Sequence, residues 1–265
     1  MAKVLEFKAS NIRPFTSWLK RFSSIDNSLL LEIDEVNKEF LAKTYNPEKS
    51  VVKFSRISFE EAGLELSSKP SLKSRIKVGI YHIPRLMKSL DHFVSEDFYL
   101  GFKYDEMIGE DSGLVGTSIL LKNASLKMNL TCTPLDIFRY ISDNLFITNI
   151  AQIQPDVSFE LTRAKIEKIN SLCNLDNEYR FLDFKTKDKK LNVRGKTFEF
   201  SLADSGKAET GISIYKAQFE KIDDENYNVE LSDEKIIYKS KDSQTITVTS
   251  MVVKDEKYDE STTDF

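Results

Sequence analysis

The alternation of apolar and polar residues along the chain predicts a protein built mainly of antiparallel strands. Apolar side chains occupy every second position in SRIKVGI, SLKMNLTC, TFEFSL and YNVEL. A period of two residues is typical of strands that bury one face. Strands are expected at 4–8, 28–34, 37–45, 49–58, 74–81, 97–106, 113–122 and 124–133, and then at 157–161, 178–187, 189–194, 197–203, 210–214, 226–232, 234–240 and 244–253.

Helical periodicity predicts four helices, at 10–24, 83–94, 162–174 and 215–222. The first is the clearest. In NIRPFTSWLKRF, residues 11–22, the apolar side chains fall on one arc at roughly 100° per residue, and Arg13, Lys20 and Arg21 lie on the opposite arc. The second helix separates its faces equally well and exposes Arg85 and Lys88.

The order of these elements repeats. Each half of the chain shows strand, helix and three strands twice, which predicts two similar α+β domains of antiparallel sheets with two helices each. We expect an N-terminal domain at 1–133, an interdomain connector at 134–156, a C-terminal domain at 157–254 and an acidic, free tail at 255–265. The connector is too apolar for a solvated spacer, so it covers its own domain or also docks a partner.

Charge follows this organisation. The chain of 265 residues carries 42 acids against 38 Lys plus Arg, a net charge of −4. The four helical segments, taken as 9–25, 82–93, 161–174 and 214–222, nevertheless carry a net charge of +7, which leaves −11 for the remainder. One basic helix face is most often only a solvated face, but four at equivalent places in a repeat favour a common role.

An acidic protein with one basic surface fits sequence-independent association with duplex DNA. Scattered Lys and Arg contacts to phosphates attract DNA without reading bases, and they permit sliding. A protein that reads bases would instead concentrate positive charge in one domain.

The chain resembles the sliding DNA clamps, the family of processivity factors that includes proliferating cell nuclear antigen and the clamps of T4-like phages. The resemblance lies in the domain order over essentially the whole chain. It implies three subunits in a ring, with the helices lining the hole around double-stranded DNA. The cations that it implies face DNA are Arg13, Lys20, Arg21, Arg85, Lys88, Arg163, Lys168, Lys216 and Lys221.

The same resemblance implies protein partners, namely a DNA polymerase and a clamp loader. Family members dock partner peptides beneath the connector and beside the C-terminal end. By position, that pocket corresponds to Phe138, Leu145, Phe146, Ile147, Met251, Val252 and Val253. The connector here is longer and more apolar than the simplest family pattern, and Glu167 interrupts the third helix face.

Two other interpretations stay open. A β-rich oligomeric structural protein, such as a virion assembly component, would use edge strands for oligomerisation and would not bind DNA. A polymerase accessory subunit of the same fold could act without forming a ring, although it would need a more basic surface.

The sequence offers little for catalysis, metals or cofactors, and we expect none of them. His82 and His92 are not spaced as a metal-binding pair on a helix. The acids in FEEAGLEL and KIDDENYN read as turn and surface residues. Cys132 and Cys173 are expected to be reduced and buried.

The chain has no apolar run that could span a bilayer and no signal peptide. We therefore expect no membrane association and an intracellular protein. A phage protein would work in the bacterial cytoplasm and a eukaryotic one in the nucleus.

Overall fold

The computed structural model describes residues 3–67, 72, 74–94, 97–107, 113–138, 145–175, 179–205 and 209–252. These residues form two compact units, one of 1–45 and 53–141 and one of 46–52 and 142–265. Both are β-rich, with antiparallel sheets and few helices, so the expected fold class is confirmed. The domain boundaries expected from the repeat stay a prediction. The expected tail at 255–265 lies outside the described residues.

The first unit contains one sheet, in the order β4-β3-β2-β6-β8-β7-β1-β5, with β9 paired to β8. Its strands are β1 (Lys3–Ala9), β2 (Leu29–Asp34), β3 (Glu39–Tyr45), β4 (Val51–Ser58), β5 (Leu64–Leu66), β6 (Ile76–Ile80), β7 (Phe98–Met107), β8 (Gly113–Lys122) and β9 (Lys127–Thr131). One edge of β8 is shared, because β6 pairs with its start and β9 with its end.

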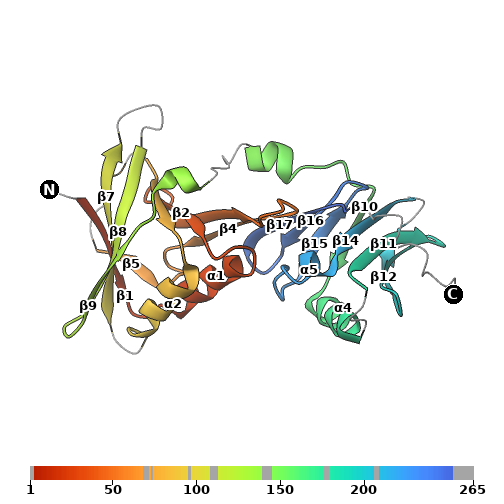
Figure 1. The fold of residues 1–265 in the computed structure, drawn as a ribbon, viewed down its shortest axis with the longest axis horizontal. Coiled ribbons are helices and arrows are strands. Elements are labelled where there is room, and N and C mark those ends of the chain that lie inside the picture. Colours follow the sequence, from red (N-terminus) through yellow and green to blue (C-terminus); the bar gives the residue numbers. More distant parts are fainter. Residues whose placement is uncertain are drawn as a thin grey trace. The chain divides into compact units, whose positions relative to one another are not determined.

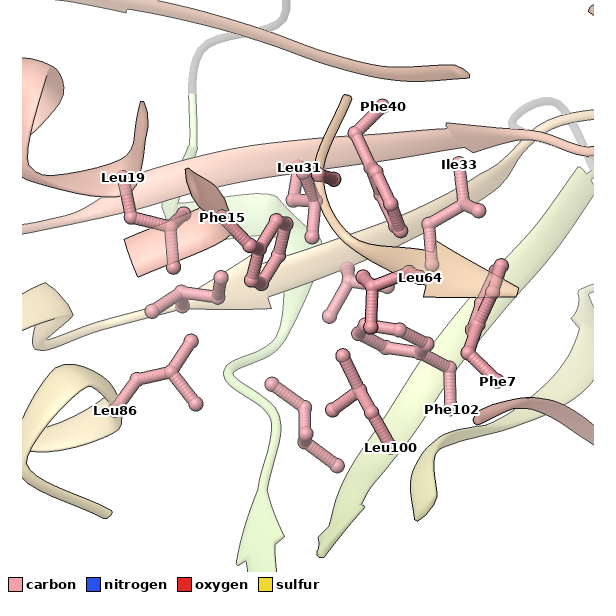
Figure 2. Close-up of a cluster of buried hydrophobic side chains, with 14 of the residues drawn as sticks. Phe7, Phe15, Leu19, Leu31, Ile33, Phe40, Leu64, Leu86, Leu100 and Phe102 are labelled. Carbon is pink, nitrogen blue, oxygen red and sulfur yellow. The ribbon is translucent and has the colours of Figure 1, made fainter. Parts of the chain in front are cut away.

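Helices α1 (Arg13–Ser23) and α2 (Ile83–Asp91) pack against this sheet and against each other (Figure 1). Phe15 and Leu19 from α1 and Leu86 from α2 point toward strand residues of the core (Figure 2). Phe40 is central, since its ring centroid lies 5.0 Å from that of Phe15 and 4.8 Å from that of Phe59. The apolar arc of each helix therefore holds it on the sheet and leaves the polar arc outward.

The second unit contains two sheets, ordered β10-β15-β16-β17 and β13-β12-β11-β14. The strands are β10 (Val157–Leu161), β11 (Phe181–Lys187), β12 (Lys190–Arg194), β13 (Glu199–Asp204), β14 (Gly211–Tyr215), β15 (Tyr227–Leu231), β16 (Lys235–Ser240) and β17 (Gln244–Ser250). Helix α4 (Arg163–Leu175) buries Ile166, Ile169 and Cys173, and α5 (Lys216–Phe219) buries Gln218 and Phe219.

Most elements lie within a few residues of their expected places, and the differences have simple causes. Strand β5 was not expected, because its three residues fall in the segment FEEAGLEL, where acids suggested a turn. The connector contains a 3₁₀ turn at Leu135–Ile137 and a π-helical turn at Phe146–Ile150. The last expected helix is shorter than predicted and ends at Phe219.

Both cysteines are free thiols, but only Cys173 is buried as expected. Cys132 is half-buried just beyond β9. Removal from water raises the pKa of the Cys132 thiol to about 12. Among the described helices, none has the length and apolar character that crossing a membrane requires.

Candidate nucleic-acid and partner interfaces

The first unit brings five of the predicted DNA-facing cations onto two adjacent helices. We call these residues the α1–α2 surface: Arg13, Lys20, Arg21, Arg85 and Lys88. All are exposed except Arg21, which is half-buried. Helix α1 contains no acid, and α2 contains only Asp91, at its last residue. The surface therefore presents positive charge that the helices themselves barely offset.

Local contacts fix both helices at their ends. Pro14 lies in the first turn of α1, where its missing N–H costs nothing. Lys20 and Arg21 lie in the last turn, where cations are stabilised by the helix dipole. In α2, the Nδ1 atom of His82 accepts a hydrogen bond of 3.0 Å from the backbone N–H of Arg85. His82 is therefore a helix cap, which accounts for one of the two histidines without metal chemistry.

The second unit offers a weaker cationic surface. Arg163 and Lys168 are exposed on α4, but the Nε atom of Arg163 lies 3.0 Å from the Oε1 atom of Glu167, one turn along the helix. Lys216 and Lys221 are half-buried, and the Lys216 Nζ atom donates to the backbone carbonyl of Cys173 at 3.5 Å. Positive charge is thus partly neutralised or turned inward in this unit.

Sequence periodicity did not show where Lys165 points. Its Nζ atom donates to the carbonyl of Leu202 at 2.7 Å and to that of Glu160 at 3.3 Å. These hydrogen bonds attach α4 to the sheet, so the ammonium group of Lys165 is used within the unit. Among the described residues, no group of three or more His, Cys, Asp or Glu side chains could hold a metal ion.

The sheet face opposite α1 and α2 carries paired charges. Arg75 contacts Glu32 at 3.2 Å and Asp34 at 2.9 Å, and Lys43 contacts Glu32 at 3.3 Å. Burial alone would raise the pKa of Asp34, but hydrogen bonds from Asn37 and Arg75 outweigh burial and lower it. This face is therefore close to neutral locally and offers phosphates little attraction.

The predicted partner residues divide between the two units. Phe138 belongs to the first unit, where its ring lies on Gly79 of β6. Leu145, Phe146, Ile147, Met251 and Val252 belong to the second unit. Val253 lies outside the described residues.

In the second unit, Lys235 links the connector to the end of β17. Its Nζ atom donates to the carbonyls of Asn149 and Ile150, each at 3.0 Å, and its backbone pairs with Ser250. Burial lowers the pKa of the Lys235 ammonium. Since Met251 follows Ser250, the end of the connector and the end of β17 lie at the same corner of the unit.

Three large apolar side chains are exposed at this corner, while Phe146 is buried and anchors the segment. We call them the connector-end cluster: Leu145 (43% exposed), Ile147 (55%) and Met251 (47%). Exposed apolar side chains grouped in this way are typical of protein-binding surfaces.

Several solved structures have a fold similar to that of this chain. Proliferating cell nuclear antigen (PCNA) from A. fulgidus, solved with the C-terminal region of FEN-1, superposes with a TM-score of 0.63 at 8% sequence identity, covering 95% of this chain and 100% of that chain. The chain has the sliding-clamp fold. PCNA from Entamoeba histolytica gives a TM-score of 0.62 at 13% identity, covering 94% of this chain and 99% of that chain.

A bacterial clamp is also similar. The DnaN sliding clamp, DNA polymerase III subunit beta, from Pseudomonas aeruginosa gives a TM-score of 0.62 at 9% identity, covering 97% of this chain and 68% of that chain. Neither a protein-family model nor a curated protein sequence matches the chain. The similarity to the clamps is therefore one of fold, without detectable similarity of sequence.

Proposed function

We propose that the chain is a sliding clamp, a non-catalytic processivity factor that encircles duplex DNA as a homotrimeric ring and tethers a replicative DNA polymerase. The fold supports a clamp role in replication. The main support for the encircling role is the α1–α2 surface. There, an acidic chain places five cations on two helices that contain one acid in total.

Simple electrostatics explains why such a surface would serve a ring. Each Lys or Arg contact with a phosphate releases counterions, so attraction is sequence-independent and weakens with salt. A ring needs little affinity, since topology keeps it on DNA. A few exposed cations on a chain of net charge −4 suit that purpose better than tight binding does.

Protein partners form the second part of the proposal. The A. fulgidus clamp was solved with the C-terminal region of FEN-1, and a Helicobacter pylori beta clamp with a DNA ligase peptide. We assign the corresponding role here to the connector-end cluster, with Phe146 as its buried anchor and Val252 beside it. The polymerase and the clamp loader are the partners that the proposed function requires.

The decisive experiment distinguishes encirclement from ordinary binding. The protein is loaded on nicked circular DNA with its cognate loader, or at high protein concentration, and retention is measured by gel filtration before and after the circle is cut. A ring stays on the circle and leaves the linear form. Equal retention on both forms would contradict encirclement and favour a non-ring accessory subunit.

Charge reversal tests the α1–α2 surface itself. The triple variant Arg13→Glu, Lys20→Glu and Arg21→Glu should lose retention on circular DNA while keeping its circular dichroism spectrum. The matched control reverses Lys185, Lys187 and Lys190, three exposed lysines on β11 and β12, and so changes the net charge equally. Equal loss in both variants would indicate a general charge effect and remove the assigned role from α1.

A further inference from the structure

A strongly basic hairpin joins β11 to β12 in the second unit. Residues 185–196 carry six Lys plus Arg against one acid, Asp188. Phe184 and Leu191 are buried in the core of the unit. Because side chains alternate along a strand, those at the adjacent and alternate positions point away from that core. We call three of these outward residues, all exposed, the hairpin lysines: Lys185, Lys187 and Lys190.

Like charges are crowded on this hairpin. Lys187 stands directly opposite Lys190 in the β11–β12 pair, an arrangement that destabilises a sheet. Asp204 stands opposite Lys190 on its other side, yet within the described part of the chain none of the hairpin lysines forms an ion pair. Lys189 adds a fourth cation at the turn, with a positive φ of 62° that usually favours glycine. The described residues therefore leave much of this positive charge unbalanced.

The C-terminal tail of the chain begins beside the same sheet. The backbone N–H of Val252 donates to the Ser213 carbonyl in β14 at 2.9 Å. Ser213 pairs with Asp183 of β11, and Lys185 lies two residues further along β11. Lys185 is thus about 5 Å across and about 7 Å along the sheet from Ser213. Residues 253–265 follow Val252 and span up to about 45 Å when extended, so all three hairpin lysines lie within their reach.

The tail has the charge that the hairpin lacks. Residues 255–265 contain five acids and one lysine, a net charge of −4. We propose that this tail docks on the hairpin lysines of its own chain, with the carboxylates of Asp255, Glu256, Asp259 and Glu260 facing the ammonium groups. The tail is then docked, whereas the sequence led us to expect a free one.

Attachment to the same chain decides between possible occupants. A short tether gives the tail an effective concentration in the millimolar range, so weak exposed ion pairs suffice and a free acidic segment of another protein competes poorly. With the tail docked, the hairpin lysines are not available to phosphates. The inference goes beyond the proposed function and does not rest on it.

Carbodiimide cross-linking of the full chain tests the contact, because it joins a carboxylate directly to a lysine amine that touches it. Peptide mapping by mass spectrometry should find links from the tail acids to the hairpin lysines. These links should fall at least fivefold between about 0.02 M and about 1 M salt, since salt screens exposed charges. In a mixture of unlabelled and isotopically heavy protein, the links should join peptides of one chain.

Lys49 is the internal control for reach. It is exposed, and the carbonyl of the adjacent Ser50 accepts from the Ser250 N–H at 2.8 Å, so Lys49 lies close to the start of the tail. A tail that moved without preference would link to Lys49 at least as often as to the hairpin. We expect Lys49 links to be at least fivefold rarer.

Proteolysis gives a second measurement. The double variant Lys187→Gln and Lys190→Gln should speed chymotrypsin cleavage after Tyr258 at least threefold, because the tail is released. The matched control, Lys38→Gln and Lys49→Gln, removes the same charge at two exposed positions and should leave the rate unchanged. Circular dichroism checks that both variants are folded.

Four outcomes would overturn the inference. They are tail links to Lys49 as frequent as those to the hairpin, links that salt does not reduce, links between heavy and unlabelled chains, and equal cleavage rates in the two double variants. The third outcome would assign the tail to a neighbouring copy, and the fourth would reduce the effect to net charge.

Discussion

At the scale of single residues, Gln218 joins three parts of the second unit. Its Oε1 atom accepts from the Tyr215 N–H at 2.6 Å, and its Nε2 atom donates to the carbonyls of Ser50 and Ser250, each at 3.1 Å. The side chain is buried. Its removal would leave one donor and two acceptors without this partner.

Gln218→Ala should therefore lower the free energy of unfolding by about 2–4 kcal/mol, since each unsatisfied buried group costs on the order of 1–3 kcal/mol and the losses overlap. Urea titration followed by circular dichroism measures the change. Gln152→Ala, at an exposed position, is the control and should stay within about 0.5 kcal/mol of the wild type. Similar values for both variants would show that the Gln218 contacts contribute nothing net.

Cys132 gives a prediction about pH. The folded state holds its thiol pKa at about 12, against about 8.5 for an unfolded chain. Because the native protein retains the proton longer, the Cys132 contribution to stability is complete below about pH 8.5 and is lost as the pH rises toward 12.

The reactivity of Cys132 measures the same difference. At pH 9, iodoacetamide should alkylate Cys132 much more slowly in the native protein than in urea, because only the thiolate reacts. Peptide mapping by mass spectrometry distinguishes Cys132 from Cys173. Equal rates in the two states would mean that the native thiol ionises normally.

Other residue positions show where sequence periodicity fails. In β17, Thr245, Thr247 and Thr249 are buried while Ile246 is only half-buried, although the apolar residues were expected to mark the inner face. Lys53 is fully buried, with its Nζ atom donating to the Arg21 carbonyl at 3.2 Å. The Lys53 contact is tertiary, and packing decides which face of β17 is buried, so a linear pattern contains no information about either.

At the scale of elements, helices α1 and α4 differ because of one acid. Helix α1 has none, whereas in α4 Glu167 pairs with Arg163. An exposed pair of this kind adds little to stability, but it reduces the positive potential of the helix face. We therefore expect Glu167 to weaken any contact between α4 and DNA.

Glu167→Gln should raise the affinity for duplex DNA about two- to threefold at low salt and steepen the salt dependence, as expected when one more phosphate contact becomes available. Titration of labelled duplex over a range of salt concentrations measures both effects. Glu199→Gln, exposed on β13, makes the same change of charge away from the helices. An equal gain in this control would assign the effect to net charge alone.

Most elements could be predicted because long strands and amphipathic helices carry their period in the sequence. Strand β5 could not, since three residues are too few to show a period and its pairing with β1 is a tertiary contact. The placement of Phe138 and Leu145 in different units was equally hidden. Both lie in one apolar segment, and only the folded contacts distinguish them.

At the scale of the whole molecule, assembly is the test of the proposed ring. Multi-angle light scattering should give about three times the chain mass of 30.5 kDa, with dissociation on dilution if the ring is weak. A monomer at every accessible concentration would count against a ring and leave a non-ring accessory subunit as the better explanation. A larger closed or open assembly without DNA retention would instead favour a structural protein.

The shared edge of β8 has a consequence that an alignment of natural variants could detect. A Cβ atom at Gly79 would lie 2.3 Å from the Thr133 carbonyl oxygen, and one at Gly116 would lie 2.8 Å from Val78. Neither position accommodates a side chain while Thr133 crosses β6 and Val78 of β6 lies this close to β8. Diverged relatives that keep both close approaches should therefore keep glycine at both positions. The pair offers an evolutionary signature for a chain whose other similarities to known clamps lie in its fold.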